Sequence, residues 1–178
     1  DVQTLGLCAL DETTYNSALV AYAKCGEYDV MIDYLVNKLL PNNIQPTQST
    51  CNVIMAILYK QEQIDVANKF FMECRKAGAD VGNLTYALLI EMRGKHGDVA
   101  GAFLLLDELK SRVSKYGTYH LTYLFTHRFV ELVLVNNKLV DEKDERWPAL
   151  SNLLARKDRI DLSLQEFGEF VNLVDTFR

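Results

Sequence analysis

Side chains that can bind a charged or hydrogen-bonding ligand recur at regular intervals: Asn16, Lys24, Asn52, Lys60 and Lys95. Each lysine lies eight residues after Asn16, Asn52 or Ala87, and these three positions are 36 and 35 residues apart. An asparagine amide carries both a donor and an acceptor, and evenly spaced lysines can follow the phosphates of a single strand. Alternatively, the asparagines occupy polar helix starts and the lysines complement helix dipoles at C-terminal ends.

No set of residues forms a recognisable catalytic or metal-binding motif. His120 and His127 are seven residues apart on one expected helix, without a third ligand at a suitable spacing. The charged run 141–146 is most simply a solvated loop or helix start, and Trp147 either packs at a helix start or anchors a partner. The sequence has no Walker loop, nucleophile elbow or His-Glu-x-x-His. We therefore predict no enzymatic activity, metal, cofactor or small-molecule substrate.

Composition limits the class of protein. The chain has 178 residues, which fits one domain or one solenoid segment, and its net charge of −5 argues against a generic nucleic-acid binder with a basic surface. A local basic stripe remains compatible with that charge. The apolar runs are far too short to cross a bilayer, and we recognise no signal or transit segment, so we expect no membrane partner.

The cysteines follow the repeat rather than a metal-ligand pattern. No Cys-x-x-Cys is present, and the spacings are 17, 26 and 23 residues. We therefore expect reduced thiols, with core positions for the two in the second repeat. The four residues are Cys8, Cys25, Cys51 and Cys74.

Residues 49–82 show a complete helix–turn–helix pattern around which the rest of the chain is organised. An apolar run over 53–59 leads to a turn at Lys60, and a second amphipathic segment ends at Ala77-Gly78. The same pattern occurs upstream and downstream, and a fixed period of this size predicts a stacked solenoid. We predict three repeats, at 12–47, 48–82 and 83–117.

The first repeat contains helices over 15–24 and 29–40, and its extra residue is expected in the loop at Pro41-Asn42-Asn43. Residues 118–178 are expected to form a degenerate repeat and capping helices. These helices cover 119–135, 147 to about 156, and 162–177. Residues 1–11 resemble the end of a preceding repeat, so we expect Asp1 to lie inside a longer protein.

The repeats resemble the pentatricopeptide repeat. Thr14–Leu19 followed by Ala21–Gly26 is similar to the opening of that repeat, and Lys76–Ala79 and Ile44–Thr47 are similar to its close. The period favours this family over tetratricopeptide repeats, which run at about 34 residues with a different signature. The resemblance covers residues 12–117. It implies an all-α, right-handed α-solenoid that binds RNA in a modular manner, one base per repeat.

The resemblance also assigns roles to single positions. In the family, the fifth and last residues of each repeat face the base, which here gives the pairs Asn16 with Thr47, Asn52 with Gly82, and Ala87 with Gly117. The second residues flank the bases, and these are Thr13, Ser49 and Leu84. The turn lysines approach phosphate, and these are Lys24, Lys60 and Lys95.

Three departures weaken base reading. Good base readers usually carry Asp or Asn at the last position, where this chain has Thr, Gly and Gly. Ala87 cannot hydrogen-bond a base, and Thr13 and Ser49 offer little apolar surface to sandwich one. We expect at most a weak pyrimidine preference in the first two repeats and no sequence reading in the third.

Two functions agree with these observations. The first is a structural component of a large organellar ribonucleoprotein, such as the mitochondrial ribosome, which contacts both RNA and other proteins. The second is an RNA-binding adaptor in the processing, stability or translation of an organellar transcript. Eroded reading positions, acidic charge and only three repeats favour the first. The resemblance places the chain in a mitochondrion, or alternatively in a plastid. A tetratricopeptide-like peptide scaffold is the third alternative.

Overall fold

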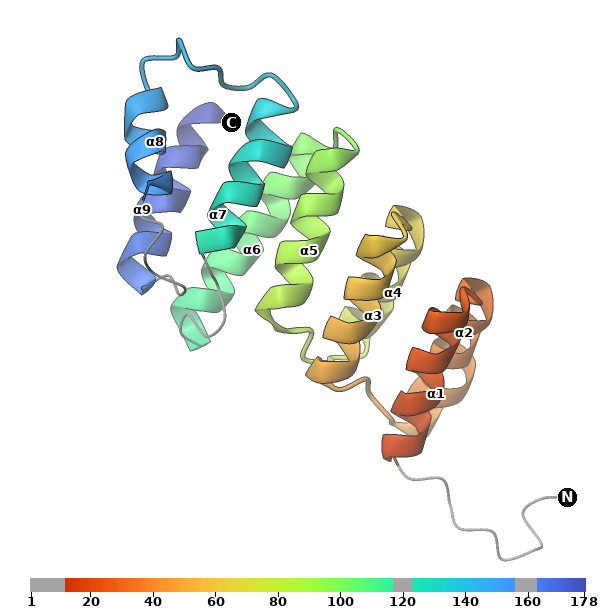
Figure 1. Cartoon of the computed structure of the whole chain (residues 1–178). Helices are drawn as coiled ribbons and strands as arrows, with labels where there is room; N and C mark the ends of the chain where they lie inside the picture. The colour runs from red at the N-terminus through yellow and green to blue at the C-terminus, as the bar shows by residue number, and fades with distance from the viewer. Residues whose placement is uncertain (1–11, 117–122, 156–162) are drawn as a thin grey trace, which may run out of the picture. The chain divides into compact units, whose positions relative to one another are not determined.

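The computed structural model describes residues 12–116, 123–155 and 163–178, and every regular element among them is helical (Figure 1). The predicted all-α fold is therefore confirmed. The chain divides into two compact units, Asp1–Gly82 and Asn83–Arg178. The end predicted for the preceding repeat, at 1–11, lies outside the described residues.

The first unit consists of helices that pack in sequential pairs. Helix α1 packs on α2 and α3 on α4, and the two hairpins also contact each other through α1 with α3 and α2 with α4. This arrangement is that of helical repeats. The helices are α1 (Glu12–Cys25), α2 (Tyr28–Tyr34), α3 (Gln48–Lys60) and α4 (Ile64–Lys76), and α2 continues as the π-helix η2 (Leu35–Leu39) and the 3-10 turn η3 (Leu40–Asn42).

Apolar residues at helical spacing form the core of this unit. Leu19, Met31 and Leu35 of the first hairpin are fully buried, as are Ile54 and Phe70 of the second. Each hairpin alone would expose one apolar face, so stacking the two supplies the burial that stabilises both.

The turns inside the hairpins repeat with the period of the sequence. Gly26, Glu62 and Gly97 all have positive φ, at 76°, 54° and 80°, and they are 36 and 35 residues apart. A glycine adopts this left-handed conformation without a steric cost, whereas Glu62 is one of the uncommon non-glycine residues that does so. The backbone therefore repeats where the sequence repeats.

The extra residue of the first repeat lies inside a helix, so its predicted place in the loop at 41–43 is wrong. Tyr28 and Ile64, which begin the second helices of the two hairpins, are 36 residues apart. Asn43 and Gly78, the left-handed residues that follow those helices, are 35 apart. The additional residue must lie between Tyr28 and Asn43, and the π-helix η2 takes it up because a π-turn contains one more residue than an α-turn.

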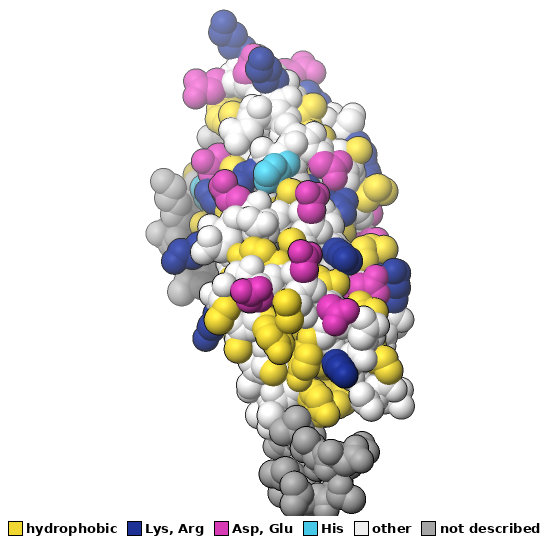
Figure 2. All heavy atoms as spheres, turned by 90° about the vertical axis from the view of Figure 1, so that its right-hand side faces the viewer, with side chains coloured by type: hydrophobic (Ala, Val, Ile, Leu, Met, Phe, Trp, Pro, Cys, Tyr) yellow, Lys and Arg dark blue, Asp and Glu magenta, His cyan; other side chains and the backbone are white. Residues whose placement is uncertain are grey.

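Three tyrosines lie together on the first hairpin. The ring of Tyr34 is 6.3 Å from Tyr15 and 5.3 Å from Tyr22, measured between centroids, and all three side chains are half-buried. Partial burial raises the pKa of Tyr34, and the two neighbouring phenols add to the effect. Figure 2 is turned so that this hairpin lies toward the viewer, and hydrophobic side chains reach the surface there among acidic and basic ones.

The second unit is built around aromatic side chains. Phe129 packs edge-on against Phe103 and Phe170, with both centroid distances 5.6 Å, and Phe125 lies 6.1 Å from Phe170. Helix α6 packs on α9, and α7 on α8. The elements are α5 (Gly82–Lys95, whose first residue closes the first unit), α6 (Val99–Tyr116), α7 (Tyr123–Phe129), the π-helix η4 (Val130–Val135), α8 (Trp147–Leu154), α9 (Leu164–Val174) and the 3-10 turn η5 (Asp175–Phe177).

Two arginines attach the last residues of this unit to its body. The Arg146 guanidinium lies over the Phe177 ring at 3.9 Å and donates to the Thr176 carbonyl oxygen. Arg178 donates to both carboxylate oxygens of Asp107 in α6, at 2.6 and 3.3 Å. The helix predicted at 162–177 is thus present as α9 and η5, and it starts two residues late behind a capping box at Ser163.

Candidate nucleic-acid interface

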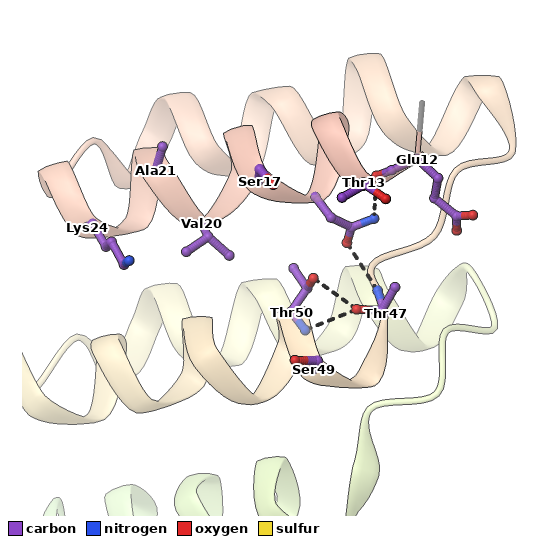
Figure 3. A pocket seen from close by; sticks show the side chains of 10 residues that line it. Glu12, Thr13, Ser17, Val20, Ala21, Lys24, Thr47, Ser49 and Thr50 are labelled. Carbon is purple, nitrogen blue, oxygen red and sulfur yellow. Dashed lines mark hydrogen bonds between the residues drawn. The ribbon is translucent and has the colours of Figure 1, made fainter. Parts of the chain in front are cut away.

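A cavity of about 490 Å³ lies between α1 and the start of α3 in the first unit (Figure 3). Five of its lining residues are predicted RNA contacts, namely Thr13, Asn16, Lys24, Thr47 and Ser49. The other lining residues are Glu12, Ser17, Val20, Ala21 and Thr50. We call this site the α1–α3 groove. The structure thus brings together the positions predicted to read the first base, together with the turn lysine of the same repeat.

Thr47 is fixed at the mouth of the groove because it caps helix α3. Its backbone is extended, with φ −69° and ψ 159°, and its Oγ1 accepts a hydrogen bond from the Thr50 backbone amide at 3.2 Å. The Thr47 and Thr50 hydroxyls are also 3.0 Å apart. Replacing such a cap by alanine costs about 1 kcal/mol. The Thr47 hydroxyl therefore has a structural role as the N-cap of α3.

Asn16 is the buried centre of the groove. Its side chain is only 7 % exposed. Nδ2 donates to the Glu12 carbonyl oxygen at 2.9 Å, and Oδ1 accepts from the Thr47 backbone amide at 3.1 Å (Figure 3). One donor and one acceptor of the amide, the groups that base reading requires, are thus used inside the protein.

The exposed polar groups of the groove surround this buried centre. Thr13 and Ser49 are exposed, and so is Ser17, which the sequence reasoning did not single out. Lys24 is exposed in the last turn of α1 and forms no ion pair with any described residue. Val20 and Ala21 add small apolar surface between them. Hydroxyls and one ammonium group can bind sugar and phosphate oxygens, and they carry little information about base identity.

The predicted contacts of the second repeat are distributed differently. Asn52 is half-buried in the middle of α3, and Lys60 is exposed at its last residue. Gly82 is buried with φ +61°, and a Cβ added there would lie 2.5 Å from Nε2 of Gln48. The Gln48 side chain therefore covers Gly82, which leaves this position unable to face a ligand.

The described residues of the third repeat do not form a reading site. Leu84 is 44 % exposed near the start of α5, and Lys95 is exposed at its end, but Ala87 is only 6 % exposed. Gly117, its predicted partner, lies outside the described residues. A buried alanine cannot contact a base, which agrees with the expectation that this repeat does not read sequence.

The remaining candidates from the sequence fall into the core or onto the surface. Cys51 and Cys74 are fully buried, and a hydrogen bond between their thiols together with burial raises the pKa of Cys74. Cys25 is exposed, and Cys8 lies outside the described residues, as does His120. His127 is half-buried on α7.

Neither a metal cluster nor a membrane span is found in the described part of the chain. Within residues 12–116, 123–155 and 163–178, no three His, Cys, Asp or Glu side chains group to hold a metal ion. The helices described in the structure are also too short or too polar to span a membrane.

Comparison with known proteins identifies one repeat directly. The family model of the PPR repeat matches residues 13–36, which correspond to α1 and most of the following helix. No curated protein and no solved structure matches the chain. The chain therefore contains a PPR repeat, and the match supports a protein of the PPR family. PPR proteins are typically non-catalytic RNA binders and are generally organellar.

Proposed function

We propose that this protein is a structural component of a large organellar ribonucleoprotein, such as the mitochondrial ribosome, and that it contacts RNA through the α1–α3 groove. The observation that supports this proposal is the state of Asn16. Its amide holds α3 in place, and the polar groups that remain exposed around it are hydroxyls, the Lys24 ammonium group and the Glu12 carboxylate. Such a groove binds phosphate and ribose rather than bases.

The small number of sites supports an assembly role over an independent RNA reader. Stacking contributes about 1–3 kcal/mol per base, whereas association costs about 4–15 kcal/mol in translational and rotational freedom. A few weak contacts would barely offset that cost, so protein partners must supply further binding energy. The proposal includes neighbouring proteins of the same particle as partners and a mitochondrial location, with a plastid as the alternative.

One observation favours the adaptor function instead. Asn52 is half-buried rather than buried, so the second repeat keeps an amide near the surface at a position the family uses for base reading. In that case the protein would bind one transcript and act in its processing, stability or translation.

Fluorescence anisotropy with ten-nucleotide oligo(U), oligo(C) and oligo(A) tests the groove. We expect affinities within about threefold of one another and a steep dependence on salt. A tenfold or larger preference for a pyrimidine strand would contradict phosphate-dominated binding and favour the adaptor.

Sedimentation of the native organellar protein, followed by RNA crosslinking, tests membership of the particle. Crosslinks to ribosomal RNA in a ribosome-sized fraction are expected, whereas a light particle holding one transcript would overturn the proposal.

A further inference from the structure

A second cavity, of about 750 Å³, lies in the second unit, where the chain leaves η4 and enters α8. This volume falls in the range of small-molecule sites, about 300–1,000 Å³. We call it the Trp147 cavity. Its lining residues are Val135, Lys138, Leu139, Val140, Asp141, Glu142, Lys143, Asp144 and Trp147.

An indole and aliphatic side chains form the apolar part of this cavity. Trp147 is half-buried at the first residue of α8 and is the single tryptophan of the chain. Val140 is 5 % exposed, whereas Val135 leaves 42 % of its surface open. A half-buried indole beside an open apolar wall is a platform on which a flat aromatic ligand can stack.

Some charged side chains that line the cavity are already hydrogen-bonded within the protein, and we call these engaged; the others are available to a ligand. Asp144 is engaged, because Nη2 of Arg146 lies 2.6 Å from its Oδ2 and Nε of Arg146 donates to Oδ1 at 2.8 Å. Asp141 is partly engaged, because its Oδ1 accepts from the Lys143 backbone amide at 2.8 Å. Among the described residues, the side chains of Lys138, Glu142 and Lys143 form no hydrogen bond or ion pair.

An indole, one available carboxylate and two available ammonium groups together match one kind of ligand. The ammonium groups suit phosphate, and the indole suits a base. A carboxylate accepts hydrogen bonds only, so it favours a base with two adjacent donors on one edge. Guanine presents N1–H and the N2 amino group side by side. Adenine has no ring N–H on that edge, uracil has one donor between two acceptors, and cytosine has one amino group.

We propose that the Trp147 cavity binds a guanine nucleotide, with the base stacked on Trp147, its N1–H and N2–H donated to Glu142, and its phosphate held by Lys138 and Lys143. The ligand is either a free guanosine phosphate or a guanosine within single-stranded RNA. This site lies wholly within residues 135–147 and does not depend on the RNA-binding role proposed for the α1–α3 groove.

Trp147 itself reports on occupancy, because it is the only indole in the chain. Its fluorescence is titrated in the whole protein with GMP, AMP, CMP and UMP, and separately with five-nucleotide RNAs with and without a central guanosine. We expect saturable quenching with a Kd for the guanine ligand about tenfold or more below the others, the discrimination typical of a bidentate contact. Equal quenching by all four nucleotides, or no guanine-dependent quenching by any nucleotide or RNA, would overturn the proposal.

The two ligand sources give different titrations. If GMP saturates the quenching alone, the site takes a free nucleotide. If only the guanosine-containing RNA does so, the site belongs to an RNA contact. A Lys24→Ala variant is expected to leave both titrations unchanged, which separates failure of this site from failure of the α1–α3 groove.

Variants identify the roles of the charged groups. Glu142→Gln replaces one acceptor by a donor and should reduce the guanine preference to about threefold or less, with little change in AMP binding. Asp141→Asn is the matched control, because its remaining oxygen can still accept from Lys143, and the preference should persist. Lys138→Ala should weaken all phosphorylated ligands but not guanosine. An unchanged preference in Glu142→Gln would exclude the assigned role of that carboxylate.

Discussion

Asn16 Oδ1 accepts a hydrogen bond from the Thr47 backbone amide at 3.1 Å, which joins the first helix to the cap of the third across 31 residues of sequence. The same side chain donates to Glu12 at 2.9 Å and is almost fully buried. The position predicted from the family resemblance to contact a base is therefore one that connects two hairpins in this chain. Replacing the Asn16 side chain should therefore first reduce the stability of the fold.

We predict that Asn16→Ala lowers the free energy of unfolding by about 1–3 kcal/mol, because the Thr47 amide loses its partner in a buried setting. Urea unfolding followed by circular dichroism measures the change. Ser17→Ala, on the exposed side of the same helix, is the control and should change stability by less than about 0.5 kcal/mol. If Asn16→Ala unfolds like the wild type but shifts the RNA base preference, Asn16 contacts a base.

Lys24 and Lys60 should contribute to RNA affinity through phosphate alone. Each alanine substitution is expected to weaken oligo(U) and oligo(A) binding equally and to reduce the slope of log K against log salt by about 0.7, the value for one phosphate neutralised on a single strand. Anisotropy titrations across a range of salt give the slope. Lys69→Ala on α4 removes a charge outside the predicted set and serves as the control. Slopes that stay at the wild-type value would exclude phosphate binding by these lysines.

Gly82 is predicted to resist substitution. At φ +61°, an alanine is strained by about 1–2 kcal/mol, and its Cβ would also meet Nε2 of Gln48 at 2.5 Å. Gly82→Ala should therefore lower the unfolding free energy, and adding Gln48→Ala should restore only the part due to the contact. Gly168→Ala is a control for which the opposite sign is expected. A Cβ added at this helical position would meet nothing within 4 Å, so the substitution should raise the unfolding free energy by about 0.5–1 kcal/mol. A neutral Gly82→Ala would show that the contact with Gln48 is not maintained.

The ion pair of Asp144 and Arg146 should make the stability of the fold depend on pH in the acidic range. Hydrogen bonds from Arg146 lower the pKa of Asp144 from 3.8 to about 2. Because the folded value lies below the unfolded one, the pair stabilises the fold above about pH 4 and loses this contribution as the pH falls toward 2. Carboxyl NMR titration measures the midpoint. Arg146→Gln should raise it toward 3.8, and an unperturbed midpoint in the wild type would mean that the pair does not persist in solution.

Periodicity made much of the fold predictable. Phe125, Phe129, Leu132 and Val133 recur at helical spacing within the helix predicted at 119–135, and all four are 5 % exposed or less. A 3.6-residue pattern reports burial directly, because it reflects only which face of a helix is covered. Leu121, which shares this spacing, lies outside the described residues.

The candidate sites were less predictable, because they depend on contacts between distant or irregular segments. The hydrogen bond between Asn16 and Thr47 joins residues 31 apart in the sequence, and no local pattern distinguishes a structural amide from one available to a ligand. The cap at Thr47 had a signal in the sequence, a threonine three residues before Thr50 at a helix start. The Trp147 cavity is formed by a loop whose path follows from turn geometry rather than from periodicity.

The π-helix at Leu35–Leu39 has a further consequence for the register of the repeats. It holds the single residue by which the first hairpin exceeds the second, and the left-handed Asn43 still ends this helix as Gly78 ends its counterpart. Because the additional residue lies inside the helix, the loop that follows it keeps the same length as the corresponding loop of the second repeat. The two repeats therefore differ in length only within this helix, and Thr47 follows Asn43 by the same four residues by which Gly82 follows Gly78.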